Sequence, residues 1–459
     1  MTRTNQPDTL RRVLSLKHLV FFGMAFMAPL AIFTMYGVVT QATGGMLPAA
    51  FLLAMIAMLF TAYSYGQMVK AYPIAGSSFT YTQKSIHPNV GFMVGWSILL
   101  DYCLVPMIVV LIGGFTLADV FPAVPANVWT LLLIIIITMI NIFGISLTAK
   151  VNILLVLFQF LVIAIFIGLS IKEILQENIS VNFTLPFFNP NYVFSNLMLG
   201  VAIACQSFLG FDGITTLSEE TIEPRKNIPR AIFLAALITG IGFIIVAYLG
   251  HLVYPDYTKF PNPDTAANEI IKHIGGNLFS TFYTAVLLLM VISVGTASQV
   301  GASRVLYTMG REGLLPKRFF CYSHPKYKTP SLNIILIGMI ALSSLLMNLV
   351  TAASLINFGA FFAFTFVNVA VFAHYYVKER RRSFKETIRY FILPMLGAII
   401  TFGLLISLDT LSKTLGSIWL AIGFIFLLCL TKMFKQKLPE LTFDDTELNE
   451  KLVDEKMTS

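Results

Sequence analysis

The chain has 459 residues, of which 57% are hydrophobic and only 12% are charged, and its formal net charge is +8. A soluble globular protein carries roughly twice that share of charged residues. The composition therefore excludes a soluble globular domain and predicts an integral membrane protein.

Apolar runs long enough to cross a bilayer recur from residue 18 to residue 434. A helix needs about 20 residues to cross about 30 Å of hydrocarbon. We therefore expect an all-α membrane protein with twelve transmembrane helices. They are predicted at residues 18–41, 46–70, 89–118, 128–146, 150–171, 195–217, 229–253, 277–307, 331–349, 352–377, 390–408 and 415–434.

The two ends of the chain differ from these spans. Residues 1–17 are predicted to form a cytoplasmic N-terminal arm. No short apolar segment with a cleavage site precedes the first span, so no removable signal peptide is expected. Residues 435–459 are polar and acidic and have no apolar face, which predicts a disordered cytoplasmic tail.

The basic residues provide a test of this arrangement. If the N-terminus is cytoplasmic and twelve crossings follow, only four of the 31 Lys and Arg residues fall on the outer side: Lys172, Lys259, Lys272 and Lys413. This bias follows the positive-inside rule, and a miscounted span would have scrambled it. It supports both termini in the cytoplasm and a multi-pass protein of the cell (inner) membrane. The positive charge is then a topology signal, and no nucleic-acid partner is predicted.

Two spans are interrupted near their middles by glycine, proline or an acid, at residues 19–33 and 199–213. Helices one to five (residues 18–171) and six to ten (195–377) form two sets of five, and the second set enters the membrane from the opposite side. Helices eleven and twelve (390–434) stand outside this inverted repeat. Matched broken helices in two such halves indicate the substrate site of a secondary transporter. A packing glycine at Gly23 or a proline kink at Pro29 is the alternative.

A broken helix offers two kinds of polar group to a ligand. The half-helix that ends at the break presents carbonyl groups, which can hold an ammonium group. The half-helix that resumes presents N–H groups at its positive end, which can hold a carboxylate. Such a site suits a cation or a zwitterion.

Two acids are predicted inside the membrane. Asp101 lies near the centre of helix three, and Asp212 lies at the break of helix six. An ionisable group at this depth costs about 2.5–3.5 kcal/mol on insertion scales, so it usually faces a polar cavity and is functional. Both are candidates for binding a cation or carrying a proton. For Asp101, a structural hydrogen bond to a neighbouring helix is the alternative.

A second pair of acids follows about two turns after Asp212. Glu219 and Glu220 lie near the cytoplasmic end of helix six, close in sequence to Arg225 and Lys226. We expect these four residues to form a salt-bridge cluster at an inner gate. The two glutamates are also candidates for proton coupling.

Aromatic side chains near these acids could surround a small amine. Phe26, Tyr102, Phe208 and Phe211 are the candidates. A ring face attracts an ammonium group by about 0.5–2 kcal/mol. Because the chain has 40 Phe and 17 Tyr, packing in the core or against lipid is the alternative for each. Tyr102 and Phe211 are favoured because they adjoin the acids.

Enzyme signatures are absent from the sequence. It has no phosphate loop of the GxxxxGK type, no HExxH and no GxSxG. Its six histidines and four cysteines show no metal-ligand spacing. No enzymatic activity, cofactor or metal site is predicted.

Several segments carry a resemblance to a known family. They are residues 72–81 (YPIAGSSFTY), 90–97 (VGFMVGWS), 99–102 (LLDY), 207–212 (SFLGFD), 217–221 (LSEET), 228–231 (IPRA) and 356–360 (INFGA). The chain resembles the amino acid–polyamine–organocation superfamily of permeases, from its first helix to about residue 435. The LLDY and LSEET forms make it most similar to the bacterial putrescine importers.

This resemblance implies a five-plus-five inverted repeat, alternating access and, in most members, uptake driven by protons. It also implies a substrate held between the breaks of helices one and six, beside helices three and eight. Carried over by position, the substrate-binding residues are Ala25, Phe26, Met27, Tyr102, Phe208, Gly210 and Phe211.

The sequence departs from the superfamily pattern at two places. Many amino acid permeases have Gly-x-Gly at the first break, where this chain has Gly23, Met24 and Ala25. The change weakens the expected carboxylate site and fits a substrate that has no carboxylate. Some proton-coupled members carry a lysine in helix five, where this chain has Gln159, which cannot be charged. The proton carrier would then be an acid such as Asp101, Asp212 or Glu219.

Three functions are compatible with these features. The first is a proton-driven importer of putrescine or a related polyamine, because Asp101 and Asp212 could hold the two ammonium groups of a diamine. The second is a permease for neutral or cationic amino acids, whose substrate needs one ammonium site and N–H donors for its carboxylate. The third is a nutrient-sensing receptor on a transporter scaffold.

Overall fold

The computed structural model describes residues 12–75, 77–176, 183–189, 193–260, 266–311, 313–345 and 349–436. Over these residues the chain is helical and has no β-strand, apart from an isolated bridge between Leu14 and Thr221. Residues 1–11 of the predicted N-terminal arm, and the predicted acidic tail from residue 437 on, lie outside the described residues.

The first half of the chain forms the helices α1 (Leu16–Met27), α2 (Ala31–Ala42), α3 (Leu47–Ala71), α4 (Ser77–Ser85), α5 (Pro88–Val120), α6 (Ala126–Ile142) and α7 (Ile145–Gln176). The second half forms α8 (Phe194–Cys205), η1 (Gln206–Phe208), η2 (Phe211–Glu220), α9 (Pro224–Val253), η3 (Tyr257–Lys259), α10 (Ala266–Arg311), α11 (Lys317–Phe320), α12 (Ser331–Ala341) and η5 (Leu342–Leu345). The chain continues with α13 (Leu349–Val371), η6 (Phe372–Lys378), α14 (Phe384–Thr387), η7 (Ile388–Ile392), α15 (Leu393–Ser407) and α16 (Thr410–Leu430).

The prediction of an all-α membrane protein is confirmed. Among the described residues, nine helical segments are long and apolar enough to cross a membrane, or ten when the bent pair α1–α2 is taken as one span. Two shorter apolar helices, at Ala126–Ile142 and Ser331–Leu345, coincide with the predicted fourth and ninth spans. Each predicted span thus coincides with a helix, while the count of twelve crossings and the inverted repeat stay predictions.

Two differences from the predicted helices have local reasons. The segment between the second and third spans forms the helix α4. The helix was not predicted, because it consists mainly of Ser, Thr, Tyr and Gln and contains no apolar run. It is nevertheless buried over almost its whole length. The helix α10 begins earlier than predicted, at Ala266, and bends at Gly276, whose φ is +63°. The predicted start at residue 277 coincides with this bend.

Helix starts follow ordinary local rules. Proline stands at the first positions of α3, α9 and α15, where no N–H is needed within the helix. Asp409 caps α16, because its carboxylate accepts a hydrogen bond from the N–H of Ser412 at 3.0 Å.

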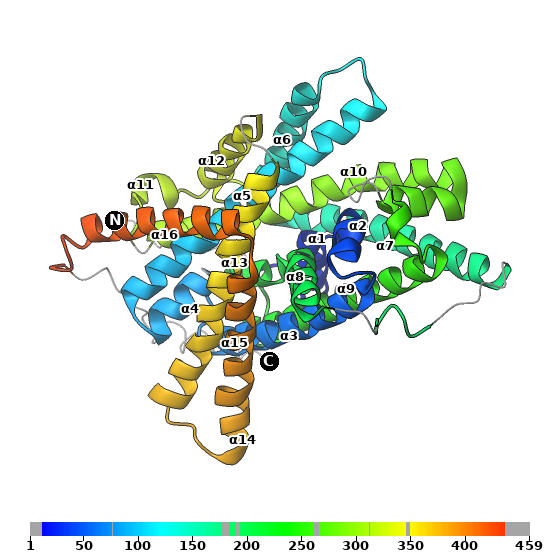
Figure 1. Cartoon of the computed structure of the whole chain (residues 1–459). Coiled ribbons are helices and arrows are strands. Elements are labelled where there is room, and N and C mark those ends of the chain that lie inside the picture. The colour runs from blue at the N-terminus through cyan, green and yellow to red at the C-terminus, as the bar shows by residue number, and fades with distance from the viewer. Residues whose placement is uncertain are drawn as a thin grey trace, which may run out of the picture.

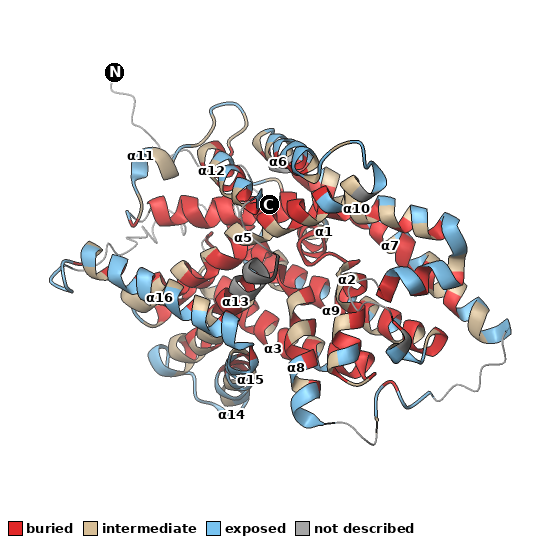
Figure 2. Ribbon diagram, turned by 45° about the horizontal axis from the view of Figure 1, so that its top comes forward, coloured by how far each residue is buried: buried red, intermediate tan, exposed pale blue. Residues whose placement is uncertain are grey.

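The broken segments lie in the middle of the molecule. Figure 1 shows α1 near the centre, with α6, α12, α14 and α16 at the periphery, and Figure 2 shows the buried residues concentrated in the central helices. In the apolar stretch of Phe194–Glu220, 78% of the residues are buried, against 17% in that of Thr410–Leu430. The peripheral helices expose large apolar side chains such as Ile399 and Phe402. In a membrane-spanning protein these side chains face lipid, whereas the polar backbone of the breaks is kept inside.

Candidate functional site

The first broken span bends by 43° between α1 and α2. Helix α1 ends at Met27, Ala28 has a φ of +53°, and Pro29 has no N–H to continue the helix. The N–H of Leu30, at the start of α2, donates to Oε1 of the buried Gln159 on α7 at 3.4 Å. A side chain from another helix thus satisfies a backbone group that the break leaves without a helical partner.

The break lies later in the chain than the sequence indicated. We expected the first break at residues 23–25, but these residues lie inside α1, and the irregular residues are 28–30. The predicted substrate-binding residues Phe26 and Met27 lie in the last turn of α1. Ala25 and Met27 are buried there. A helix ends with carbonyl groups that have no intrahelical donor. The predicted residues therefore contribute the carbonyl end of the break.

The second broken span separates α8 from η2. Gly210 has a φ of +109°, a left-handed conformation that glycine adopts without strain. After it the chain continues as a 3₁₀-helix of ten residues, although such helices rarely exceed about four residues. Hydroxyl groups bond back to carbonyls three residues earlier, from Thr215 to Asp212 at 2.7 Å and from Thr216 to Gly213 at 2.6 Å. These bonds stabilise a geometry that often marks a functional hinge.

The side chain of Phe26 joins the two breaks. Its ring lies against Gly210 and Gly213 of the second span, where an added Cβ would stand 2.5 Å and 2.7 Å from ring carbons. On another side its ring centroid is 5.9 Å from that of Tyr102 on α5. Phe26 therefore contacts both the second broken span and Tyr102 of α5, and the two glycines leave the space that its ring occupies.

The two predicted acids lie in this region, and both are fully buried. The hydroxyl of Tyr102 donates to Oδ2 of Asp212 at 2.5 Å, and it also lies 3.5 Å from Oγ of Ser77 on α4. Among the described residues, Oδ1 of Asp212 and both carboxylate oxygens of Asp101 have no hydrogen-bond partner. Asp101 precedes Tyr102 in α5, so the helix that binds Asp212 also carries the second acid. The alternative proposed for Asp101, a structural hydrogen bond, has no support in this geometry.

Phe211, the neighbour of Asp212 in the chain, packs among aromatic rings. Phe211 is 5.9 Å from Tyr65 on α3 and 5.3 Å from Phe364 on α13, and Tyr65 is 6.1 Å from Tyr81 on α4. The hydroxyls of Tyr65 and Tyr81 have no hydrogen-bond partner among the described residues. These four rings form what we call the aromatic cluster. Tyr65, Tyr81 and Phe364 were missed, although Tyr81 belongs to the segment 72–81 that carried the resemblance.

Phe208, the fourth aromatic residue predicted near the acids, packs away from the aromatic cluster. It packs edge-on against Phe243 of α9 at 5.3 Å and touches the position of Gly240 in the same helix. Its ring contacts are thus with α9, and the structure gives it no ring contact with the aromatic cluster among the described residues.

Glu219 and Glu220 do form salt bridges, but the predicted partners were wrong. Glu220 binds Arg304 of α10 through two hydrogen bonds of 2.6 Å and 3.0 Å, and both side chains are buried. Glu219 binds Arg311, the last residue of α10, at 2.6 Å. Arg225 and Lys226 point elsewhere because they start a new helix, α9, after the turn at residues 221–223.

The N-terminal segment closes over this salt-bridge cluster. The N–H groups of Val13 and Leu14 donate to the carbonyl of Glu220, and Ile222 donates back to Leu14 at 2.9 Å.

Among the described residues, no three His, Cys, Asp or Glu side chains gather as ligands of a metal would. The second broken span thus carries the buried Asp212 at the start of η2 and the ion-paired Glu219 and Glu220 at its end.

The chain is similar to known proteins over nearly its whole length. The sequence pattern of the amino acid permease family matches residues 18–434 of this chain. The chain is 41% identical to the low-affinity putrescine importer PlaP of Escherichia coli (strain K12) over 447 residues, which cover 96% of this chain and 99% of that protein. It is 26% identical to the branched-chain amino acid permease BcaP of Bacillus subtilis (strain 168), with 92% and 93% of the two chains covered. It is also 26% identical to the methylthioribose transporter of the same organism, over 92% of this chain and 94% of that protein.

Proposed function

The chain belongs to the amino acid permease family, and we propose that it imports putrescine or a related small polyamine across the cell (inner) membrane. The proposal includes alternating access, proton symport and cytoplasmic placement of both termini. The similarity to a putrescine importer over 96% of the chain supports the substrate class.

The observation that carries this proposal is the pair of buried acids. Asp101 and Asp212 have three carboxylate oxygens without a hydrogen-bond partner among the described residues. A buried carboxylate is costly unless a positive group or a proton compensates it. No basic side chain forms an ion pair with either acid in the described parts of the chain, and the buried Arg304 is bound to Glu220. A diamine supplies two positive groups to two acids.

The position of Asp212 also argues against a substrate carboxylate. The acid lies in the first turn of η2, where the N–H groups give a helix its positive end. Such an N–H end can hold the carboxylate of an amino acid substrate. Here a carboxylate of the protein already lies there, so the site favours an amine without an acid group.

Alternating access requires a hinge and a gate, and we assign both. The hinge is the pair of breaks at residues 28–30 and at Gly210, next to the long 3₁₀-helix η2. The inner gate is the salt-bridge cluster of Glu219, Glu220, Arg304 and Arg311. Since Gln159 cannot carry a proton, we assign proton coupling to Asp101 or Asp212.

Uptake by reconstituted vesicles tests the proposal. The full chain should accumulate labelled putrescine above the level of protein-free vesicles, and unlabelled putrescine should compete better than branched-chain or cationic amino acids. A protonophore that collapses an imposed pH gradient should stop accumulation. Uptake confined to amino acids, without competition by putrescine, would establish the amino acid permease instead. Binding of putrescine without accumulation would establish a receptor.

A further inference from the structure

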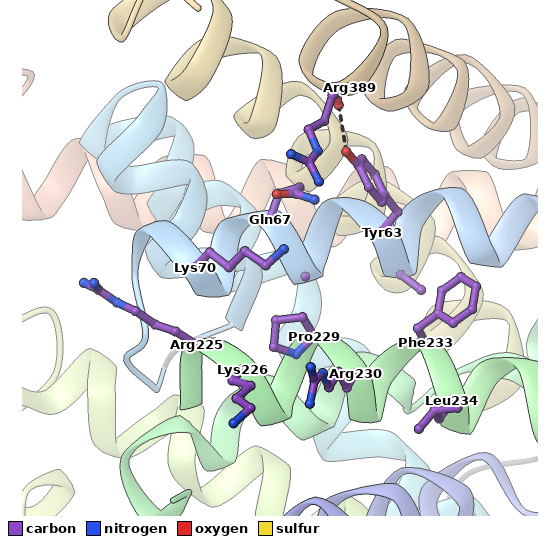
Figure 3. A pocket seen from close by; sticks show the side chains of 12 residues that line it. Tyr63, Gln67, Lys70, Arg225, Lys226, Pro229, Arg230, Phe233, Leu234 and Arg389 are labelled. Atoms are coloured by element: carbon purple, nitrogen blue, oxygen red, sulfur yellow. Dashed lines mark hydrogen bonds between the residues drawn. The ribbon is translucent and has the colours of Figure 1, made fainter. Parts of the chain in front are cut away.

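A cavity lies away from the broken helices, beside α3 and α9. It has a volume of about 650 Å³, and its walls come from the second half of α3, the first turns of α9 and the residue Arg389 ahead of α15. Five of the side chains that line it are basic: Lys70, Arg225, Lys226, Arg230 and Arg389. Figure 3 shows α3 between the two walls, with Arg389 on one wall and Arg225, Lys226 and Arg230 on the other.

These positive charges are hardly compensated. In the described parts of the chain, Lys226 pairs with the exposed Glu223 at 3.1 Å, and the other four basic residues form no ion pair. The charges of Lys70 and Arg389 are close enough to repel each other. A positive-inside bias explains basic residues at this end of the helices. That bias does not explain why three segments far apart in sequence place basic side chains around the same cavity. Binding of an anionic ligand in the cavity would explain it.

The same cavity is apolar at its other end. Phe233 and Leu234 of α9 line it there, opposite the basic end (Figure 3). Both side chains are exposed, and the exposed face continues along α9 with Ile238, Ile241 and Ile245. In a membrane-spanning helix such a face contacts acyl chains. The cavity therefore opens toward lipid, and its basic end lies at the end of the span.

We propose that this cavity binds an anionic phospholipid, with the phosphate at the basic end and the acyl chains along the exposed face of α9. Guanidinium groups match phosphate oxygens with two parallel hydrogen bonds. Arg230 of α9 and Arg389 of η7 both line the cavity, so the bound lipid links these two segments beside α3. A soluble anion would use the basic end and leave the apolar end without a function.

The test is a lipid titration of the purified full-length protein in detergent, followed by its thermal unfolding midpoint. Phosphatidylglycerol should raise the midpoint in a saturable way, and phosphatidylcholine should not. Each basic residue near an anionic headgroup contributes about 1 kcal/mol, so Arg230→Gln with Arg389→Gln should weaken the apparent affinity roughly 30-fold. The matched control, Lys317→Gln with Arg318→Gln on the exposed helix α11, should leave it unchanged.

Three results would overturn the proposal. The first is an unchanged affinity in the double variant. The second is an equal effect of phosphatidylcholine, which would mean that the headgroup charge is not recognised. The third is an equal effect of inorganic phosphate, which would make the cavity a site for soluble anions. If the double variant does not fold, the exposed single variant Arg225→Gln provides the same test, with a loss of about fivefold expected. The readout is lipid affinity, so it does not depend on which substrate is transported.

Discussion

The ion pair between Glu220 and Arg304 makes a quantitative prediction about stability. Their two hydrogen bonds measure 2.6 Å and 3.0 Å, and the side chains are only 2% and 1% exposed. Replacing one partner leaves the other as an uncompensated buried charge, which costs about 3–5 kcal/mol. We therefore expect Arg304→Met to lower the free energy of unfolding by about that amount. Replacing both residues by methionine should recover most of the loss, because no charge is then left buried.

The chain contains its own control for this experiment. Lys226 and Glu223 form an ion pair of 3.1 Å whose side chains are 57% and 61% exposed. Exposed pairs contribute about 0–1 kcal/mol because water and salt screen them, so Lys226→Met should change the free energy of unfolding by no more than that. The measurement is a denaturant titration of Arg304→Met, Glu220→Met, the double methionine variant and Lys226→Met in one detergent. The reasoning is refuted if Arg304→Met costs no more than Lys226→Met, or if the double methionine variant loses the sum of both single losses.

Three further predictions concern the region between the breaks. Asp101→Asn should raise the apparent KM for putrescine about 10- to 150-fold, because a charge-assisted hydrogen bond of about 1.5–3 kcal/mol is lost. The KM for a monoamine should rise less. The control variant Glu269→Gln, on the surface of α10, should behave as wild type. Gly213→Ala places a Cβ 2.7 Å from the ring of Phe26 and should lower the uptake rate, with Phe26→Leu restoring it; no rescue would mean that the clash is elsewhere. Tyr102→Phe removes the donor to Asp212 and should weaken putrescine uptake at equal protein levels, so unchanged uptake would exclude this bond from the transport cycle.

Local sequence features were sufficient for some of this site. The presence of a break in the first span could be predicted, because glycine and proline within one apolar run both weaken a helix there. Asp101 and Asp212 could be predicted as buried acids, because an acid within an apolar run has no exposed position to occupy. Both deductions use only residues within a few turns of one another.

The same reasoning misplaced features that depend on neighbouring segments. The first break is located by Ala28 and by the bond from Leu30 to Gln159, which lies 129 residues away. The polar helix α4 escaped detection because its burial comes from the helices packed around it, and not from its own composition. Tyr81 enters the aromatic cluster with that helix.

The membrane-protein class, the all-α fold, the apolar spans and the presence of two breaks could all be predicted, because hydropathy, proline and glycine act within a few residues of where they stand. The side-chain partners came from the packing of distant segments: Tyr102 for Asp212, Arg304 for Glu220, and the five basic residues around one cavity. Arg225 and Lys226 were predicted as the partners of Glu219 and Glu220 because they are close in sequence. In the structure they start the new helix α9, which directs their side chains elsewhere. Pairing between helices depends on how whole segments pack, and that information is spread over the entire chain.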